Sequence, residues 1–365
     1  MSTETVLQNA KEGYKKRFGN DPLATAFAPG RVNLLGEHTD YNGGLVLPMP
    51  LSLGTAVAIG YGGEPGTLRA ASEAFEEIDE RSLSEGATGA WSDYVLGSIL
   101  ALSKGEPLEN GLQVMVSSNL PVGSGLSSSA AIEIGTMRAL SDVLGVKIDP
   151  VEMAQLARSV ENDFVGLPSG IMDQFSVSVG TPGNALFLDT RSLKFQPAPL
   201  PATHDFVIVH SGVGHKLTDN GYRERVAECQ AACKALSVEM LSDLQESDLD
   251  RIAALTTPLN GRAKHIVTEN RRVEDAVAAL KAGDVTRFGE LMLASHVSQR
   301  DDYEVSVPDI DALVEGAIAF GADGARLTGG GFGGSIVALV EKGKVEDWCA
   351  KISAKFPQTR ILAVT

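Results

Sequence analysis

The sequence predicts an α+β protein built from two domains. Its 365 residues exceed the usual size of one domain, and a hydrophobic content of 43% is enough for sizeable cores. Helix-like and strand-like segments are mixed without the regular strand–helix–strand alternation of a doubly wound parallel sheet. A Pro-rich, irregular stretch at 190–203 marks the expected boundary. We therefore expect an N-terminal domain at 1–192 and a C-terminal domain at 193–365.

Hydrophobic periodicity and turn residues predict the elements in chain order. Asp149 is a plausible N-cap, with Pro150 at the first position of the helix that follows. The expected helices lie at 3–18, after Trp91, at 127–145, at 149–164 and through much of 220–298. The expected strands lie within 24–72, where Gly, Pro and Asn turns separate four segments, and at 113–118, 184–190, 206–211 and on both sides of a Gly-rich turn within 324–340.

Charge, cysteine content and the distribution of apolar residues argue against several classes of protein. The net charge is −16 and no Lys/Arg run is long enough for a basic face, so we expect no nucleic-acid partner. Residues 41–63 carry no charge, but Pro48, Pro50 and several glycines favour two buried strands over a membrane span. The N-terminus lacks the apolar region of a signal peptide. The three cysteines do not have metal-ligand spacing and suit a reducing cytoplasm.

Two Gly-rich segments are candidates for close approach to a ligand. The segment at 119–135, NLPVGSGLSSSAAIEIG, follows a strand and enters a helix through three serines, which leaves backbone N–H groups and the helix dipole available to a phosphate. It lacks the Lys of a P-loop and the third Gly of the dinucleotide-binding motif. A capped helix after a tight turn is the alternative. The segment at 327–340 has five glycines in six positions, and it is either a flexible turn or a loop close to another backbone.

Buried or unfavourably placed carboxylates point to a charged ligand. Glu161 and Asp163 lie at the end of the helix predicted at 149–164, where negative charge is disfavoured unless a cation compensates it or the helix end is solvated. Asp173 has apolar neighbours, so it needs a partner, and Arg31 is a candidate.

The stretch RVNLLGEHTDYNGG at 31–44 concentrates ionisable groups that can serve the same chemistry. Phosphate near Ser127–Ser129, a metal on Ser129 and Glu161, and Asp173 beside Arg31 are the parts that phosphoryl transfer needs. Three further polar residues of the stretch can exchange hydrogen bonds with a polyol: Glu37, His38 and Asp40.

Five motifs, in order along nearly the whole chain, resemble those of the galactokinase family in the GHMP small-molecule kinase superfamily. They are APGRVNLLGEHTDYN (28–42), LPVGSGLSSSAAIE (120–133), VENDFVGLPSGIMDQF (160–175), SHVSQRDDYEVSVPDID (295–311) and LTGGGFGGS (327–335). The resemblance implies a domain like the second domain of ribosomal protein S5, followed by a ferredoxin-like domain, with the active site between them. It implies a cytoplasmic enzyme, a monomer or weak dimer, that uses ATP and Mg²⁺ to phosphorylate galactose at its anomeric hydroxyl, giving galactose 1-phosphate.

The resemblance also assigns roles by motif position. Asp173 would be the catalytic carboxylate and Arg31 its partner, and Ser129 and Glu161 would ligate Mg²⁺. Residues binding the sugar would be Glu37, His38, Asp40, Gly170, Asp173 and Tyr222. Residues binding ATP would lie in 121–131, namely Pro121, Gly123, Ser124, Gly125, Leu126, Ser127, Ser128, Ser129 and Ala130, with Ser72 and Trp91 near the nucleotide.

The chain departs from the family pattern at three places, of which the first two spare the assigned roles and the third bears on sugar specificity. The chain has Glu161-Asn162 where Glu-His is common, Pro168-Ser169-Gly170 where Pro-Cys-Gly is common, and Arg223 where the Asn after the sugar-binding Tyr is usual. A kinase of a related sugar, such as arabinose, galacturonic acid or N-acetylgalactosamine, is therefore an alternative. A non-catalytic galactose sensor is another, although such relatives have a shortened serine–alanine run and here 127–131 is intact.

Overall fold

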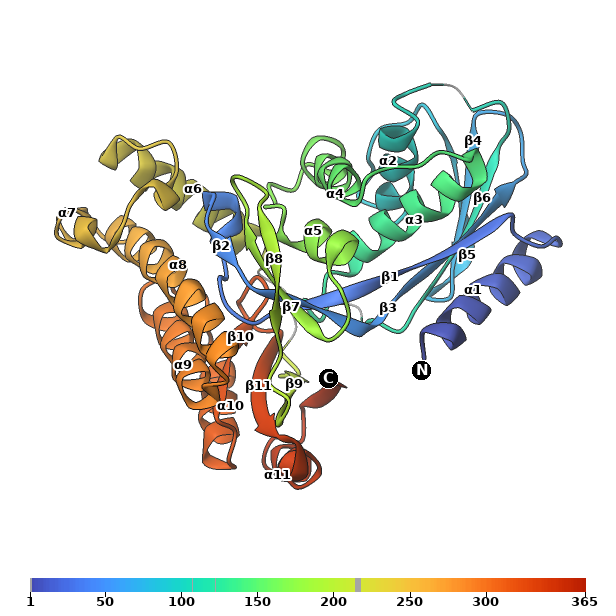
Figure 1. Ribbon diagram of the computed structural model, residues 1–365. Coiled ribbons are helices and arrows are strands. Elements are labelled where there is room, and N and C mark those ends of the chain that lie inside the picture. The colour runs from blue at the N-terminus through green and yellow to red at the C-terminus, as the bar shows by residue number, and fades with distance from the viewer. Residues whose placement is uncertain (1, 107, 122, 214–217) are drawn as a thin grey trace. The chain divides into compact units, whose positions relative to one another are not determined.

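The computed structural model describes residues 2–106, 108–121, 123–213 and 218–365, and it confirms the α+β class (Figure 1). The chain forms two compact units, each assembled from separate segments. The first unit comprises Met1–Arg31, Pro50–Val122 and Ser127–Gly180, and the second comprises Val32–Met49, Gly123–Leu126 and Thr181–Thr365. The domain division at 192 and 193 stays a prediction.

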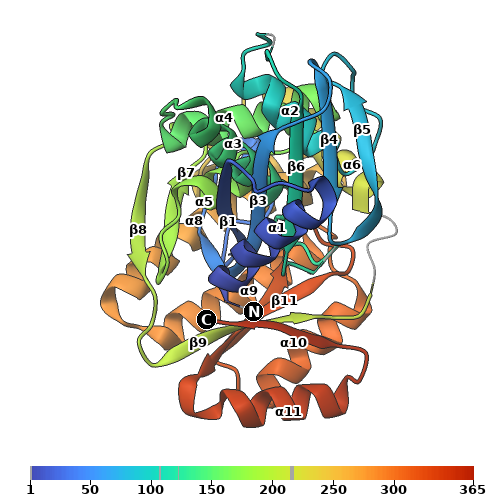
Figure 2. The same cartoon turned by 90° about the vertical axis from the view of Figure 1, so that its right-hand side faces the viewer.

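The first unit is built on a five-stranded sheet. Its strands, in the order β1-β3-β6-β4-β5, are β1 (Ala24–Asn33), β3 (Pro48–Tyr61), β6 (Leu112–Ser118), β4 (Thr67–Ser72) and β5 (Phe75–Ser82). Figure 2 shows these strands edge to edge, with α1 (Thr3–Phe18) in front of them. The remaining helices of the unit are α2 (Asp93–Leu102), α3 (Ser128–Leu144), α4 (Pro150–Ser159) and α5 (Met172–Val179).

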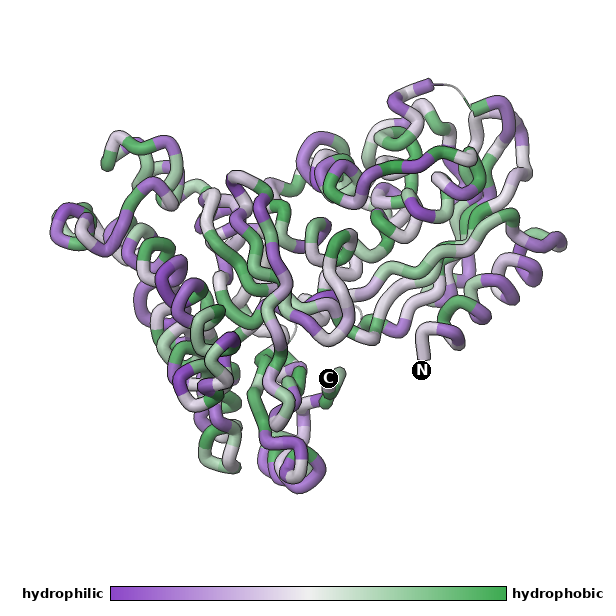
Figure 3. The backbone as a smooth tube through the Cα atoms, viewed as in Figure 1, coloured by the Kyte–Doolittle hydropathy of each residue, from purple (hydrophilic) through white to green (hydrophobic). Residues whose placement is uncertain are grey.

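Alternation along the strands gives this sheet two buried faces. Ala56 and Ala58 of β3 pack with α1, whereas Val57 and Ile59 pack with α2 and α3. Successive side chains of a strand point to opposite faces, so one strand serves both layers. Figure 3 shows hydrophobic residues along the strands, whereas α1 combines hydrophobic and hydrophilic residues.

The second unit contains two smaller sheets. One has the order β10-β11-β9-β12, from β10 (Gly324–Thr328), β11 (Ser335–Glu341), β9 (His204–His210) and β12 (Arg360–Val364), and all its pairs are antiparallel. The other joins β2 (Leu45–Val46), β7 (Asn184–Asp189) and β8 (Phe195–Pro199). The helices are α6 (Thr218–Leu236), α7 (Leu249–Ala253), α8 (Leu259–Ala282), α9 (Val285–Asp301), α10 (Pro308–Ala319) and α11 (Val345–Lys355).

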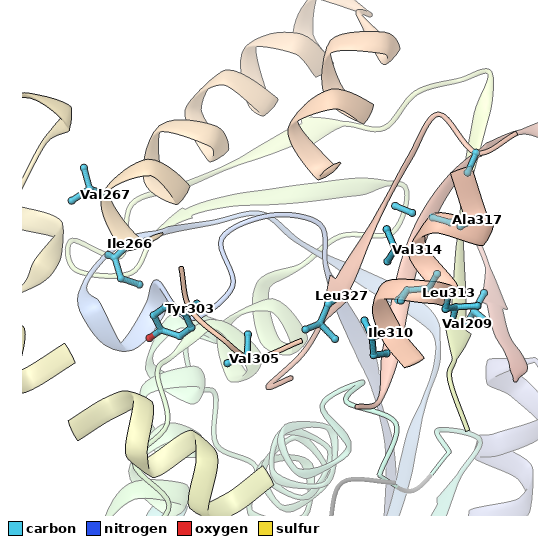
Figure 4. Packing of buried hydrophobic residues seen from close by; sticks show 14 of the residues in the cluster. Val209, Ile266, Val267, Tyr303, Val305, Ile310, Leu313, Val314, Ala317 and Leu327 are labelled. Carbon is cyan, nitrogen blue, oxygen red and sulfur yellow. The ribbon is translucent and has the colours of Figure 1, made fainter. Parts of the chain in front are cut away.

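The core of the second unit lies between the four-stranded sheet and its helices. Figure 4 shows Ile310, Leu313 and Val314 of α10 packed near Val209 of β9 and Leu327 of β10. All five side chains are at most 3% exposed. Leu327 of β10 and Ile336 of β11 belong to the same buried cluster, so both strands that flank the Gly-rich turn are packed into this core.

Two sequence expectations need correction. The stretch at 190–203 is not irregular throughout, because Phe195–Pro199 forms β8 at the edge of its sheet, a position that tolerates proline. The helix expected over 149–164 is α-helical only to Ser159 and continues as a π-helical turn, η2 (Val160–Val165), which ends at Gly166 in the left-handed conformation. π-turns widen a helix locally and are common at functional sites.

The other elements that place candidate site residues follow the prediction closely. α3 ends at Leu144 with Gly145 as a left-handed cap, and Asp149 caps α4 through hydrogen bonds from Val151 and Glu152. Of the helices in the described part of the chain, none combines the length and apolar character needed to cross a membrane.

Candidate active site

The first unit brings together Arg31 and Asp173, which are 142 positions apart in the sequence. Asp173 lies in the first turn of α5, and Arg31 lies near the end of β1. Arg31 Nε donates to Asp173 Oδ1 at 2.7 Å, and Arg31 Nη2 donates to Oδ2 at 2.6 Å. Two parallel N–H···O bonds fix the relative orientation of the two groups. The pairing that the sequence indicated is therefore present.

Ser127 supplies a third contact to Asp173. Its Oγ donates to Asp173 Oδ2 at 2.7 Å. Ser127 is also the N-cap of α3, where a serine ordinarily accepts a hydrogen bond from a backbone N–H of the first turn, but this cap bond is not made. Its φ of 59° is in the left-handed region, which a non-glycine residue occupies at a cost. The hydroxyl of Ser127 thus serves Asp173 and not the helix backbone.

A second carboxylate, Glu161, is buried in the π-helical turn η2. Burial raises its pKa, and hydrogen bonds with the side chains of Ser169, Ser129 and Gln174 oppose that increase. The structure thus joins the two residues predicted to hold a metal, Ser129 and Glu161. In a regular α-helix the carboxylate would occupy a different angular position, so the π-turn helps set where it points.

Glu133 is a third carboxylate in this group, and the sequence interpretation missed it. It is fully buried in α3, and burial together with the charge of Glu161 raises its pKa well above the usual range. Its Oε2 accepts a long hydrogen bond of 3.4 Å from Gln174, while its Oε1 has no partner among the described residues. Its position four residues after Ser129, on the same face of the helix, was the available signal.

These side chains suit a hard cation. Mg²⁺ prefers oxygen ligands and commonly uses one or two carboxylates, with water and phosphate oxygens completing an octahedron. Ser129 and Glu161 provide such oxygens, and a cation here would offset the repulsion that Glu133, Glu161 and Asp173 exert on one another. No cluster of three or more His, Cys, Asp or Glu arranged as metal ligands occurs in the described ranges, so further ligands would come from a substrate or water.

Part of the predicted phosphate loop lies beside the second Gly-rich turn, within the second unit. Gly125 has a φ of 74°, and a Cβ added to Gly329 would lie 3.4 Å from Gly125 O. Ser335 Oγ donates to Ser124 O at 2.9 Å. The turn joining β10 to β11 therefore approaches another backbone closely, as its glycines predicted. Within the predicted loop, Val122 lies outside the described residues.

The stretch at 36–44 is fixed within the second unit, and Glu37 has an internal role that its sequence did not reveal. Glu37 Oε1 accepts from Gly329 N at 2.7 Å and from Thr328 Oγ1 at 3.0 Å, and Oε2 accepts from Asn33 Nδ2 at 3.0 Å. The carboxylate thus ties this loop to the start of the Gly-rich turn. Arg326, fully buried, lies 3.6 Å from the same carboxylate and was also missed.

Aromatic side chains surround His38. His38 has a φ of 63°, and Asn42 Nδ2 donates to its carbonyl oxygen at 2.9 Å. The ring centroid of Tyr222, from α6, lies 5.7 Å from that of His38 and 5.3 Å from that of Tyr41. The structure therefore brings together two of the predicted sugar-binding residues, His38 and Tyr222.

The remaining predicted residues are spread over both units. Asp40 begins the short 3-10 helix η1 (Asp40–Asn42), and its carbonyl oxygen accepts from Thr190 Oγ1 at 3.1 Å. Gly170, in the first unit, is buried three residues before Asp173.

Ser72 and Trp91 are linked through a residue that the sequence interpretation overlooked. Ser72, buried at the end of β4, pairs in register with Phe75 of β5, and Phe75 stacks on Trp91 with ring centroids 5.8 Å apart.

Arg225, two positions beyond the departure from the family pattern at Arg223, holds the start of α6 in place. Arg225 Nε donates to Tyr303 O at 2.8 Å, and Arg225 Nη2 donates to Glu304 O at 3.0 Å. These bonds hold α6 to the segment after α9. Tyr222 is therefore anchored through a residue three positions along the same helix.

Comparison with known proteins identifies the family. The galactokinase galactose-binding signature matches residues 12–61, the GHMP kinases N terminal domain matches 93–181 and the GHMP kinases C terminal domain matches 276–358. Galactokinase from Haemophilus influenzae is 39% identical, with 99% of this chain and 96% of that protein aligned. Galactokinase from Chloroflexus aurantiacus is 40% identical over 94% of this chain and 90% of its own.

Solved structures agree with these relatives. The crystal structure of Lactococcus lactis galactokinase complexed with galactose has a TM-score of 0.90 and 34% identity, and covers 98% of this chain and 97% of its own. Methanococcus jannaschii mevalonate kinase, with a TM-score of 0.70 and 22% identity over 92% of this chain and 96% of its own, shares the fold. The fold and the matched domains define a GHMP small-molecule kinase. Within that class, the chain belongs to the galactokinase family.

Proposed function

We propose that this enzyme transfers the γ-phosphoryl group of ATP to the anomeric hydroxyl of D-galactose, giving galactose 1-phosphate for galactose catabolism. The observation that carries the proposal is the two-point contact between Arg31 and Asp173, with Ser127 on the same carboxylate, in a chain of the galactokinase family. Lactococcus lactis galactokinase, which is 34% identical, was crystallised with galactose. These features support galactose as the acceptor.

In this proposal Asp173 receives or orients the proton of the attacking hydroxyl. The contacts from Arg31 and Ser127 hold the carboxylate in one orientation, and its side chain is 29% exposed, so part of it can reach a substrate. Arg31 compensates the carboxylate charge, and its planar guanidinium is suited to the charge that develops on the transferred phosphoryl group. Catalysis of this kind depends on positioning and charge neutralisation more than on covalent chemistry.

ATP and Mg²⁺ are the proposed cofactors. The N-terminus of α3 and the flanking residues within 121–131 would bind the phosphates, with Ser72 and Trp91 near the nucleotide. Ser129 and Glu161 would hold Mg²⁺, which supplies neutralisation of phosphate charge when bound. The buried position of Glu161 and its bond with Ser129 support this assignment.

The proposed sugar-binding residues have different amounts of free hydrogen-bonding capacity. His38 presents a buried Nε2 that has no partner among the described residues, and Tyr222 lies beside it. Glu37 already accepts three internal hydrogen bonds, so its proposed contact with the sugar would use its remaining lone pair. Asp40 and Gly170 complete the set by their positions in the family motifs.

We further propose that the enzyme is cytoplasmic, a monomer or weak dimer, and that it acts on small molecules without nucleic-acid or membrane partners. The net charge of −16 and the three free thiols support this setting. Gel filtration with light scattering would measure the oligomeric state.

A sugar panel at fixed ATP tests the function. The panel comprises galactose, glucose, arabinose, galacturonic acid and N-acetylgalactosamine, with ADP release as the rate measurement and phosphorus NMR to locate the phosphate on the product. We expect galactose to have the highest kcat/KM and its product to be the 1-phosphate. A much higher kcat/KM for another sugar would overturn the assignment of galactose, and galactose binding without ADP release would indicate a sensor.

A further inference from the structure

Four polar atoms in the second unit form a continuous hydrogen-bonded chain that ends on His38. Tyr41 Oη lies 2.9 Å from His38 Nδ1 and 2.7 Å from Tyr303 Oη, and Tyr303 Oη lies 3.1 Å from Cys229 Sγ. Tyr303 and Cys229 are fully or almost fully buried. We call these four residues the His38 relay. Tyr303 belongs to the motif at 295–311, to which the proposed function gives no role.

The other ring nitrogen of His38 is left without a protein partner. His38 is 4% exposed, and its Nε2 is a buried polar atom to which no described residue forms a hydrogen bond. A buried polar atom without a partner costs free energy, so such an atom is a candidate to bind a ligand or a water molecule. Burial lowers the pKa of His38 to about 3, so the ring is neutral near pH 7 and one nitrogen alone carries a proton.

The chemistry of the relay decides which nitrogen this is. Burial raises the pKa of Cys229 to about 11, so the thiol keeps its proton, and Asn42 also forms a hydrogen bond with this sulfur. Sulfur is a weak acceptor, whereas an imidazole nitrogen is a much stronger one than a phenol oxygen. The favoured direction of donation therefore runs from Cys229 through Tyr303 and Tyr41 to His38 Nδ1.

We propose that Tyr41 and Tyr303 are positioning residues that fix His38 in the tautomer with its proton on Nε2, so that Nε2 donates a hydrogen bond to a hydroxyl oxygen of the sugar. The inference rests on the proposed function in one respect, namely that His38 contacts the sugar. The second tyrosine matters because Tyr41 alone could rotate its hydroxyl either way. When Tyr303 donates its hydrogen bond to the Tyr41 oxygen, the hydroxyl hydrogen of Tyr41 points at His38 Nδ1.

Hydroxyl deletion separates this role from packing. The ring centroid of Tyr303 lies 4.8 Å from that of His38 and 4.5 Å from that of His265, so removing the whole side chain would disturb the core. Tyr→Phe variants keep the rings and remove only the relay oxygen. Tyr14→Phe is a matched control in the first unit, because Tyr14 is fully buried and its hydroxyl donates to Gln113 at 3.2 Å.

The first measurement reads the tautomer directly, in the absence of substrate. Long-range proton–nitrogen NMR of the full chain labelled with ¹⁵N-histidine distinguishes the two nitrogens of a neutral ring, and His38→Gln assigns the His38 signals by their loss. We expect wild type and Tyr14→Phe to show the Nε2–H tautomer. Tyr41→Phe should shift His38 to a mixture or to Nδ1–H, and Tyr303→Phe should do so less strongly. An Nδ1–H tautomer in wild type, or an unchanged His38 signal in Tyr41→Phe, overturns the proposal.

The second measurement is the split between KM and kcat. Losing the fixed donor should raise the KM for galactose about 3- to 10-fold in Tyr41→Phe, with kcat changed less than about twofold, because one hydrogen bond in ground-state binding is weakened. If Tyr303→Phe does not fold, Cys229→Ala and Cys229→Ser replace it, with serine expected to keep the tautomer and alanine to loosen it. A tautomer shift with an unchanged KM for galactose overturns the sugar contact. A third outcome is that the tautomers are as expected but the enzyme prefers another sugar. That result would support the relay and overturn the proposed function.

Discussion

Arg31 donates two parallel hydrogen bonds to Asp173, of 2.7 Å from Nε and 2.6 Å from Nη2, one to each carboxylate oxygen. The arginine side chain is 6% exposed and the aspartate side chain 29% exposed. The guanidinium is therefore enclosed while part of the carboxylate stays accessible, and Ser127 donates to the same oxygen, Oδ2, as Arg31 Nη2. This geometry gives Asp173 a fixed direction and a compensated charge, which are the two properties that the proposed role requires.

Asp173→Asn should abolish most turnover and retain galactose binding. The change keeps the size of the side chain and removes its charge, so the loss should fall on the transition state more than on ground-state binding. Groups that accept or donate a proton in catalysis typically contribute ~10²–10⁴-fold to the rate. Steady-state ADP release gives kcat, and calorimetry gives galactose affinity. A reduction in kcat of less than about tenfold would exclude Asp173 as the proton acceptor.

Arg31→Lys tests whether the planar fork matters beyond its charge. Lysine keeps the positive charge but cannot make two parallel bonds to the carboxylate and also reach a phosphoryl group. We expect a folded protein with severely reduced kcat, and a still lower kcat in Arg31→Ala. Circular dichroism and thermal unfolding provide the control for folding. Near-normal kcat in Arg31→Lys would mean that Arg31 supplies only a compensating charge.

The sequence predicted the parts of the site that depend on local signals. Asp173 was predictable because a carboxylate between Met172 and Phe175 is poorly solvated, and Arg31 because a buried carboxylate needs a cation. The Gly-rich turn after Thr328 was predicted to approach another backbone, and it lies against Gly125.

The parts that were missed depend on contacts between distant segments. Glu133 reads as an ordinary polar position of a helix, and only the placement of Glu161 and Gln174 around it shows a buried acid. The internal bonds of Glu37 to residues 291 and 292 positions away have no sequence signal. The π-helical turn at 160–165 has none either, because it contains neither Pro nor Gly that would mark a break in the helix.

Glu161→Gln should change the Mg²⁺ dependence while leaving sugar binding intact. The amide keeps the hydrogen-bonding shape but is a poorer ligand for a hard cation than a carboxylate oxygen. Titration of activity with Mg²⁺ at saturating galactose should show a higher half-saturating concentration. Glu152→Gln is the matched control, since Glu152 is an exposed carboxylate in the first turn of α4. A Mg²⁺ titration equal to that of wild type would remove Glu161 from the metal site.

The pH dependence of stability should carry the signature of buried, neutral histidines in the second unit. Burial lowers the pKa of His265 to about 4 and that of His38 to about 3, against 6.5 for an unperturbed imidazole. Between these values each imidazole binds more protons in the unfolded chain than in the folded chain. The contribution of each histidine to the free energy of unfolding therefore rises with pH and is lost as pH falls below about 6.5. Each histidine should lower the free energy of unfolding by about 2 kcal/mol at pH 5 relative to pH 8.

Urea unfolding at several pH values between 8 and 5 measures this slope, and His265→Gln isolates one contribution to it. His265 contacts Ser298 Oγ at 2.9 Å and Glu37 O at 3.1 Å, so the variant should be less stable at pH 8 but should lose less stability on acidification. Burial alone would raise the pKa of Glu269, but the charge of Arg272 and other groups lowers it to about 2. Its effect on stability therefore falls below pH 4.5, outside the range of this experiment. Ile266→Val, a neighbouring core change in α8, should lower stability by about 0.5–1.5 kcal/mol at every pH and keep the wild-type slope. A His265→Gln slope as steep as that of wild type would show that the His265 ring does not stay neutral in the folded protein.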